Sequence, residues 1–216
     1  EVGMKLVNGL FLPESISALT GPVAKQTVEA AGETVTSDEV TTLLIKLGGG
    51  VRSIERQVNE VVGAAGAASA TGYAVLSDVA AKSAWAKLED AESNSSLAVR
   101  MTSRPLATLK ASNSTRTKIS NSHSHDISTI SDLGFGASTI FSNPENNDDA
   151  SSHTAIIVDE ISKHLGSYVI ERCPLNVKQG RDVFSDVGSS IDLMRRIKAQ
   201  YDPANTLNPG RFAGKI

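Results

Sequence analysis

The sequence predicts an α+β fold, in which an antiparallel or mixed sheet carries helices on one face in a plait-like arrangement. Short segments rich in β-branched residues alternate with segments whose apolar residues recur at helical spacing along the 216 residues. Hydrophobic residues make up 40% of the chain and charged residues 21%, which are ordinary globular proportions. We therefore expect one domain over residues 1–216 with an apolar core of its own.

Charge and composition exclude two classes of protein. The net charge is −3 and no basic stripe is present, so a sequence-independent nucleic-acid binder is not expected. No run of about 18 apolar residues occurs, so we expect no transmembrane segment. The single cysteine, Cys173, leaves no disulfide framework. These features favour the cytoplasm or an organelle matrix.

The N-terminal quarter predicts two strands. A helix is expected to end at Leu10, Pro13 breaks the chain, and a short strand follows near residues 15–19. Residues 21–39 are polar and rich in turn formers, which indicates a loop. Residues 41–47, TTLLIKL, predict a strand because they are β-branched and apolar.

A run of three glycines, residues 48–50, separates that strand from a helix predicted over residues 51–66. Bare backbone N–H groups at a helix start attract anions, so the run invites a phosphate-loop interpretation. The spacing of the known phosphate loops is absent, which favours a plain strand-to-helix turn. The helix is amphipathic and should cover a sheet with an apolar stripe of Val51, Ile54, Val58, Val61 and Val62.

The middle of the chain predicts a second helix and a half-buried strand. The helix spans about residues 77–90 with an N-cap at Ser77-Asp78, after an uncertain short strand. In the strand 95–105, Leu97, Val99 and Met101 alternate with Ala98, Arg100 and Thr102. Arg100 should therefore project away from the core face.

The rest of the chain alternates again. Residues 112–132 are rich in Ser, Thr, Asn and His and predict a loop. Residues 134–142 predict a strand and residues 143–152 an acidic turn. A helix capped by Gly166 is expected over residues 153–166, and a last strand over 166–173. A C-terminal helix is expected over residues 189–202. In the two helices the inward residues should be Ile156, Ile157, Ile161 and Leu165, then Ile191, Met194, Ile197 and Tyr201.

No complete catalytic machinery is visible among the residues. His123, His125 and Asp126 have the chemistry of metal ligands, but they lie in a Ser/Asn-rich segment without further ligands, which favours a solvated loop. Cys173 follows Arg172, a cation that lowers a thiol pKa, although a cysteine at the end of a strand is more often packed. We predict no metal site, and no catalytic residue can be assigned.

The last helix runs into a specific motif. LMRRIKAQYDPANTLNPGRF (residues 193–212) resembles the C-terminal end of FAD-linked oxidases of the vanillyl-alcohol-oxidase type, in which a basic helix leads into D-P-x-x-x-L-N-P-G-[RK]. The matching positions are Asp202, Pro203, Leu207, Asn208, Pro209, Gly210 and Arg211. Segments 41–58, 97–105 and the helix around Trp85 are similar, in order and spacing, to the cap domain of the FAD-binding subunit of glycolate oxidase.

This resemblance implies a function. The chain would be the C-terminal cap domain of a flavoprotein oxidoreductase, with a ferredoxin-like plait and with residues 189–216 as a helix and a tail near the flavin. FAD would be held mainly by an N-terminal domain absent from these residues, so the isolated chain would be inactive. The oxidase would convert a 2-hydroxy acid to a 2-oxo acid. Asn208 and Arg211 would contact the flavin, and Arg100 would hold the substrate carboxylate.

The resemblance also implies partners. They are the FAD-binding domain of the same parent protein and other oxidase subunits, including an iron–sulfur subunit. The H-x-G-D-G-N-x-H type motif of other branches is missing from LGFGAS (residues 133–138), so a metal-dependent mechanism is not expected. Three alternatives remain: a non-catalytic plait domain that binds a partner, a ferredoxin-like small-molecule sensor domain, and an ordinary helix stop followed by a surface tail.

Overall fold

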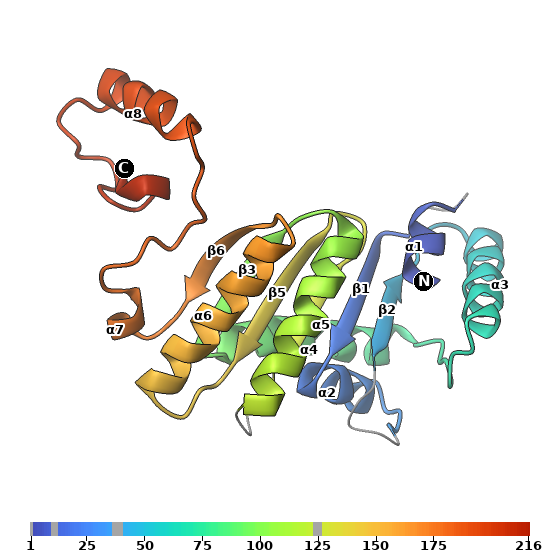
Figure 1. The fold of residues 1–216 in the computed structure, drawn as a ribbon. Helices are drawn as coiled ribbons and strands as arrows, with labels where there is room; N and C mark the ends of the chain where they lie inside the picture. Colours follow the sequence, from blue (N-terminus) through green and yellow to red (C-terminus); the bar gives the residue numbers. More distant parts are fainter. Residues whose placement is uncertain (1, 10–12, 36–40, 123–126) are drawn as a thin grey trace.

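The computed structural model describes residues 2–9, 13–35, 41–122 and 127–216, and its centre is one six-stranded antiparallel sheet (Figure 1). The strand order is β2-β1-β4-β5-β3-β6. The strands are β1 (Ser15–Thr20), β2 (Thr42–Lys46), β3 (Leu97–Thr102), β4 (Ser128–Asp132), β5 (Ala137–Ser142) and β6 (Ser167–Arg172). All named strand pairs are antiparallel, so the predicted α+β class with an antiparallel sheet is confirmed.

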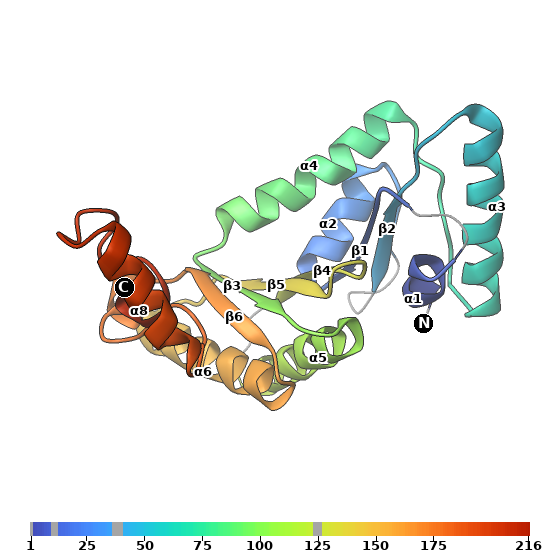
Figure 2. The same ribbon diagram turned by 90° about the horizontal axis from the view of Figure 1, so that it is seen from above.

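Four of these strands form a ferredoxin-like plait. The chain runs β3, α5 (Pro105–Ser122), β4, β5, α6 (Asn147–Lys163) and β6, and the four strands lie in the order β4-β5-β3-β6. Helices α5 and α6 pack side by side on one face of the sheet (Figure 2). Leu97, Val99 and Met101 point to that face and join a core with Ile140 and Ile157, as the alternation in the sequence predicts.

The opposite face is also covered, so the expectation of helices on one face only is wrong. Helices α2 (Pro22–Ala30) and α4 (Asp78–Asn94) lie across it (Figure 2). The cause is that the alternate strand positions are apolar too: Ala98 and Phe141 are buried against Ala84 and Leu88 of α4. Strands β1 and β2 widen the sheet beyond β4.

The far end of the sheet has its own small core. Helix α1 (Val2–Val7) packs on β1 and on α3 (Val51–Ala67), which stands at the edge of the molecule (Figure 2). Val61 and Ala64 of α3 face this cluster. Val51 is exposed, contrary to expectation, whereas Gln57 is buried and donates to the Gly48 carbonyl at 3.1 Å. Residues 48–50 form the predicted strand-to-helix turn, with Gly50 as the N-cap of α3.

Two segments predicted as loops are structured instead. Residues 21–39 contain α2, which begins with Pro22 at its first position and buries Val23, Ala24 and Thr27. Residues 112–132 contain the end of α5 and all of β4. Small polar side chains are buried there because they bond to each other, as Ser112 Oγ and Ser131 Oγ do with Ser138 Oγ at 3.0 and 2.8 Å.

Helix α6 differs from the expected 153–166 at both ends. Asn146 caps it by accepting from the backbone N–H groups of Asp148 and Asp149, so the predicted acidic turn is the first turn of the helix. At the other end Leu165, not Gly166, takes the left-handed conformation (φ 53°) and is exposed. The Gly166 N–H then bonds the Ile161 carbonyl, which closes the helix.

The remaining helices follow β6. They are the short α7 (Leu175–Lys178), α8 (Ser190–Tyr201) and a final 3₁₀ turn η1 (Ala213–Lys215). Ser77 is the N-cap position of α4, as predicted, and the segment before it contains no strand. In the described part of the chain, no helix combines the length and the apolar character that crossing a bilayer requires.

Candidate functional site

The C-terminal unit, residues 186–216, stands apart from the sheet at the end of an extended segment (Figure 1). That segment joins the edge strand β6 through a bridge between Val169 and Phe184. The Ile170 N–H donates to the Val183 carbonyl at 2.7 Å, and the Ser185 N–H donates to the Tyr168 carbonyl at 3.0 Å. The unit is therefore anchored to the plait by backbone pairing at a sheet edge.

Two contacts fasten the end of the chain to the base of this unit. The rings of Phe184 and Phe212 lie with their centroids 5.5 Å apart. The Gly214 N–H donates to the Asp182 carboxylate at 2.7 Å. Gly214 has φ 68°, and a Cβ on it would lie 2.3 Å from Ile191 Cδ1 of α8, so only glycine allows this close approach.

Asp202 organises the chain after α8. Its Oδ1 accepts from the Thr206 N–H at 2.9 Å and from the Thr206 hydroxyl at 3.1 Å. Its Oδ2 accepts from the Leu207 N–H at 2.9 Å and pairs with Lys198 Nζ. The hydrogen bond from Lys198 and those from the Leu207 and Thr206 amides hold the pKa of the Asp202 carboxyl well below its usual range.

Residues 208–211 form a tight turn. The Arg211 N–H donates to the Asn208 carbonyl at 3.2 Å, with Pro209 and Gly210 (φ 72°) at the central positions. Proline followed by a residue of positive φ is the signature of a type II turn. Asn208 itself has φ 46°, a conformation that asparagine tolerates better than most residues.

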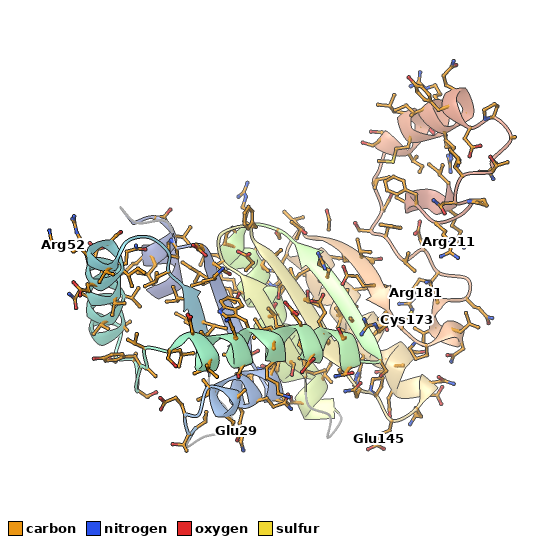
Figure 3. All side chains as sticks on the ribbon, turned by 180° about the vertical axis from the view of Figure 1, so that it is seen from behind. Glu29, Arg52, Glu145, Cys173, Arg181 and Arg211 are labelled. Atoms are coloured by element: carbon orange, nitrogen blue, oxygen red, sulfur yellow. The ribbon has the colours of Figure 1, made fainter. Side chains whose placement is uncertain are left out.

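Asn208 and Arg211 line the same open groove, of about 770 Å³, with Met194, Ile197, Tyr201 and Leu207 among its other residues. Both polar side chains are exposed, and neither makes a hydrogen bond or an ion pair with another described residue. Figure 3 shows Arg211 on the C-terminal unit, away from the side chains that fill the sheet core. The structure thus brings the two predicted cofactor contacts together.

The apolar side of α8 is not buried by the rest of the chain. The expected inward residues Ile197 and Tyr201 are 50% and 81% exposed, and no α8 residue is fully buried. Helix α8 has the predicted apolar stripe, but no surface among the described residues covers it.

Arg100 lies elsewhere, on β3 between β5 and β6. Its side chain is half exposed, as predicted for a position off the core face, but it is not free. Arg100 Nε lies 2.7 Å from Glu171 Oε1 of β6, and Arg100 Nη2 lies 3.4 Å from Glu92 Oε1 of α4. It does not line the groove of Asn208 and Arg211.

The other candidates carry no chemistry in the described residues. Cys173 packs partly against the α5/α6 core, and burial raises the pKa of its thiol more than Lys178 and Arg181 lower it. No group of three potential metal ligands occurs among residues 2–9, 13–35, 41–122 and 127–216. His123, His125 and Asp126 lie outside the described residues.

Sequence analysis missed the roles of Lys198 and Asp202. Asp202 was named only as a position of the motif at the end of the last helix, yet it is 7% exposed and accepts four hydrogen bonds. The signal was present in the spacing, because a lysine four residues before an aspartate can meet it on one side of a helix.

Comparison with known proteins points to the same segment. Residues 186–212 match the family model described as FAD linked oxidases, C-terminal domain. The matched residues begin with the C-terminal unit and end at Phe212, so they include α8, Asp202 and the turn of residues 208–211. No curated protein matches the chain. The residues that match this family model thus include most of those that line the groove.

The groove has the chemistry to meet one edge of a flavin. Tyr201, Ile197 and Leu207 offer an apolar surface for a flat ring system, and Asn208 and Arg211 offer hydrogen-bond donors beside it.

Proposed function

We propose that this chain is the C-terminal, substrate-side part of a flavoprotein oxidoreductase that uses FAD to oxidise a 2-hydroxy acid to a 2-oxo acid, as the FAD-binding subunit of glycolate oxidase does. One observation carries the proposal. The FAD-linked oxidase segment, residues 186–212, coincides with the groove that displays Asn208 and Arg211. A sequence match and an exposed polar site thus fall on the same residues.

The exposed side of α8 supports a partner for this segment. Leu193, Ile197, Tyr201 and Leu207 are each at least half exposed and lie on or directly after one helix. Such a cluster is costly to leave in water and is typical of an interface. We propose that the FAD-binding domain of the same parent protein covers it and holds most of the FAD. Further oxidase subunits, including an iron–sulfur subunit, and a place in the cytoplasm or an organelle matrix belong to the same proposal.

In this arrangement the chain's own residues bind and orient. FAD, once bound, would supply the redox chemistry as a hydride acceptor. Asn208 and Arg211 donate hydrogen bonds to the flavin side of the site, and the fixed turn holds their donors in place.

Arg100 is the proposed ligand of the substrate carboxylate. Its guanidinium already faces two carboxylates, Glu171 and Glu92, and the Glu92 distance of 3.4 Å is the longer one. An incoming carboxylate would replace Glu92 at lower cost than Glu171, because the weaker contact is the one given up. The Arg100 guanidinium, which now contacts Glu171 of β6 and Glu92 of α4, would then bind the substrate carboxylate.

The proposal is tested by titrating the chain with FAD and following flavin fluorescence and absorbance. The intact chain is compared with a chain that ends at Tyr201 and with the double variant Asn208→Ala/Arg211→Ala. We expect binding in the millimolar range for the intact chain, because most contacts with FAD come from elsewhere. Both altered chains should bind at least about tenfold more weakly, since the charge-assisted hydrogen bond of Arg211 alone accounts for roughly that factor.

The matched control is Arg196→Ala, which removes one exposed cation of α8 that does not line the groove. It should leave FAD affinity within about twofold of that of the intact chain, because Arg196 does not line the groove and salt screens the effect of its charge. Equal binding by the intact chain and by the chain that ends at Tyr201 would contradict the proposal, and so would an equal loss in Arg196→Ala.

A non-catalytic partner-binding plait is the second candidate, and the exposed side of α8 is the observation that favours it. It predicts association with a protein through α8 and no flavin response at any concentration. The titration therefore separates the two functions.

A further inference from the structure

We propose that Lys198 and Asp202 are positioning residues, which together hold the turn of residues 208–211 in the one conformation that presents Asn208 and Arg211. What the turn contacts rests on the proposed function, but how the turn is held does not. The two residues lie one helical turn apart, at the end of α8 and directly after it. Their side chains form an ion pair that joins the helix to the loop.

The pair acts on Leu207, the residue before the turn. Its N–H donates to Asp202 Oδ2 at 2.9 Å, and its carbonyl accepts from Lys198 Nζ at 2.7 Å. The N–H and the carbonyl of Leu207, which belong to two successive peptide units, are thus held by the two charged side chains. The Leu207 side chain is 65% exposed, so packing contributes little to its place. Polar contacts from Lys198 and Asp202 fix the chain where Asn208 begins.

The far end of the turn is held separately. Ala213 is 3% exposed, Phe212 packs on Phe184, and the Gly214 N–H is bound by Asp182. Between these two fixed ends, Asn208 and Gly210 both have positive φ values. A turn that is clamped at both ends and closed by its own hydrogen bond has few conformations left, whereas its two side chains remain exposed.

Ending a helix does not require this network. Pro203 alone prevents α8 from continuing, because proline lacks an N–H and its ring clashes with the preceding turn. The Asp202 carboxylate instead collects donors from Lys198, Thr206 and Leu207, which lie on both sides of it in the sequence. The geometry therefore points to a device that shapes the loop after the helix.

The test compares Asp202→Asn and Lys198→Met with the unchanged chain by two measurements. The first is amide hydrogen exchange at Leu207, which reports the loop directly. The NH₂ group of an asparagine at this position would face N–H donors that now bind the Asp202 carboxylate, such as that of Leu207. Amide exchange at Leu207 should therefore be about tenfold faster or more. The second is the FAD titration described above, in which both variants should lose affinity to the extent that the double variant Asn208→Ala/Arg211→Ala does.

Arg195→Met is the matched control, because it removes a cation of α8 whose partner, Asp192, lies outside the network. It should change neither measurement by more than about twofold. Lys198→Arg should restore slow exchange and FAD affinity together, since a guanidinium can reach both Asp202 and the Leu207 carbonyl. Lys198 and Asp202 also line the groove, so exchange at Leu207, rather than FAD affinity, separates holding the turn from direct contact with the ligand.

The two measurements separate this inference from the proposed function. Unchanged exchange at Leu207 in Asp202→Asn would overturn the positioning role, whatever the flavin result. Faster exchange with unchanged FAD affinity would overturn it too, because the turn would then bind without being held. If the unchanged chain gives no flavin response, the proposed function fails, and the exchange measurement alone decides whether the pair shapes the turn.

Discussion

At the scale of single residues, the structure buries two carboxylates among the residues it describes, and each is compensated differently. Asp202 binds backbone amides and one lysine within a loop, whereas Glu160 of α6 joins two helices. Glu160 is 3% exposed and accepts from Lys118 of α5 and from Lys163 of its own helix. Burial raises the pKa of Glu160, but hydrogen bonds from Lys118, Ser114 and Lys163 outweigh it and lower the pKa to about 2.

This lowered pKa predicts how stability depends on pH. The group's contribution is present above its unfolded pKa of about 4.5 and is lost as the pH falls toward 2, because the unfolded chain then binds the proton more readily. Glu160→Gln should lower the melting temperature at pH 7 by roughly 3–8 °C and flatten its decline between pH 4.5 and 2. Thermal denaturation followed by circular dichroism measures both.

Asp159→Asn serves as the comparison at the neighbouring position. Asp159 also pairs with Lys163, but its side chain is 57% exposed. The melting temperature of Asp159→Asn should stay within about 2 °C of that of the unchanged chain, since exposed ion pairs contribute little to stability. If the two substitutions have the same effect, the buried ion pair is not what joins α5 to α6.

At the scale of elements, the sequence predicted the strands whose residues are β-branched or alternate between apolar and polar. It did not predict the elements that are rich in small polar residues. Strands β2, β3 and β6 follow their β-branched or alternating residues, and α8 follows its 3.6-residue period. Helix α5 buries Thr108, Ser112 and Thr115, which a hydrophobicity pattern reads as solvent-facing. The Ser112 hydroxyl bonds to that of Ser138 of β5 and the Thr108 hydroxyl donates to the Gly136 carbonyl, and no local pattern shows partners this far along the chain.

In the candidate site, too, locally determined features could be predicted and contacts between distant segments could not. The motif of residues 202–211 contains Pro209 and Gly210, which favour a turn locally, and the structure has a turn there with Asn208 and Arg211 at its ends. The two ion pairs of Arg100 were not predictable, since Glu92 and Glu171 come from a helix and a strand that only the folded sheet brings to it.

The turn between β4 and β5 gives a sharp prediction for an element. Gly136 has φ 65°, and a Cβ there would lie 2.2 Å from the Ser103 carbonyl oxygen. The Gly136 carbonyl also accepts from the Ser103 N–H and from the Thr108 hydroxyl, so the backbone cannot move away freely. Gly136→Ala should therefore lower the melting temperature by roughly 3–10 °C.

Gly134→Ala is the control in the same turn. A Cβ on Gly134 has the Asp132 carboxylate as its nearest neighbour, at 3.3 Å, and that side chain can adjust. We expect a change of less than about 2 °C by the same thermal denaturation. A Gly136→Ala variant that is as stable as Gly134→Ala would show that β3, β5 and α5 do not meet as closely at this turn as described.

At the scale of the whole molecule, the chain consists of a plait with both faces covered and a C-terminal unit with its helix side uncovered (Figures 1 and 2). The plait is closed by its own helices. The C-terminal unit is held at one sheet edge by the segment around Phe184 and offers its groove outward. The segment that matches the family model, residues 186–212, lies in this unit, whose helix α8 has exposed apolar side chains.

The most direct test of the central claim is to map FAD on the ¹⁵N-labelled chain by nuclear magnetic resonance. FAD is added to millimolar concentration, and the shift of each backbone amide is followed. We predict that the shifted amides are those of the groove, from Met194 through Phe212, with Asn208 and Arg211 among the largest. Shifts confined to the glycine run at residues 48–50 or to the sheet around Arg100, or no shifts, would contradict the claim that this turn faces the flavin.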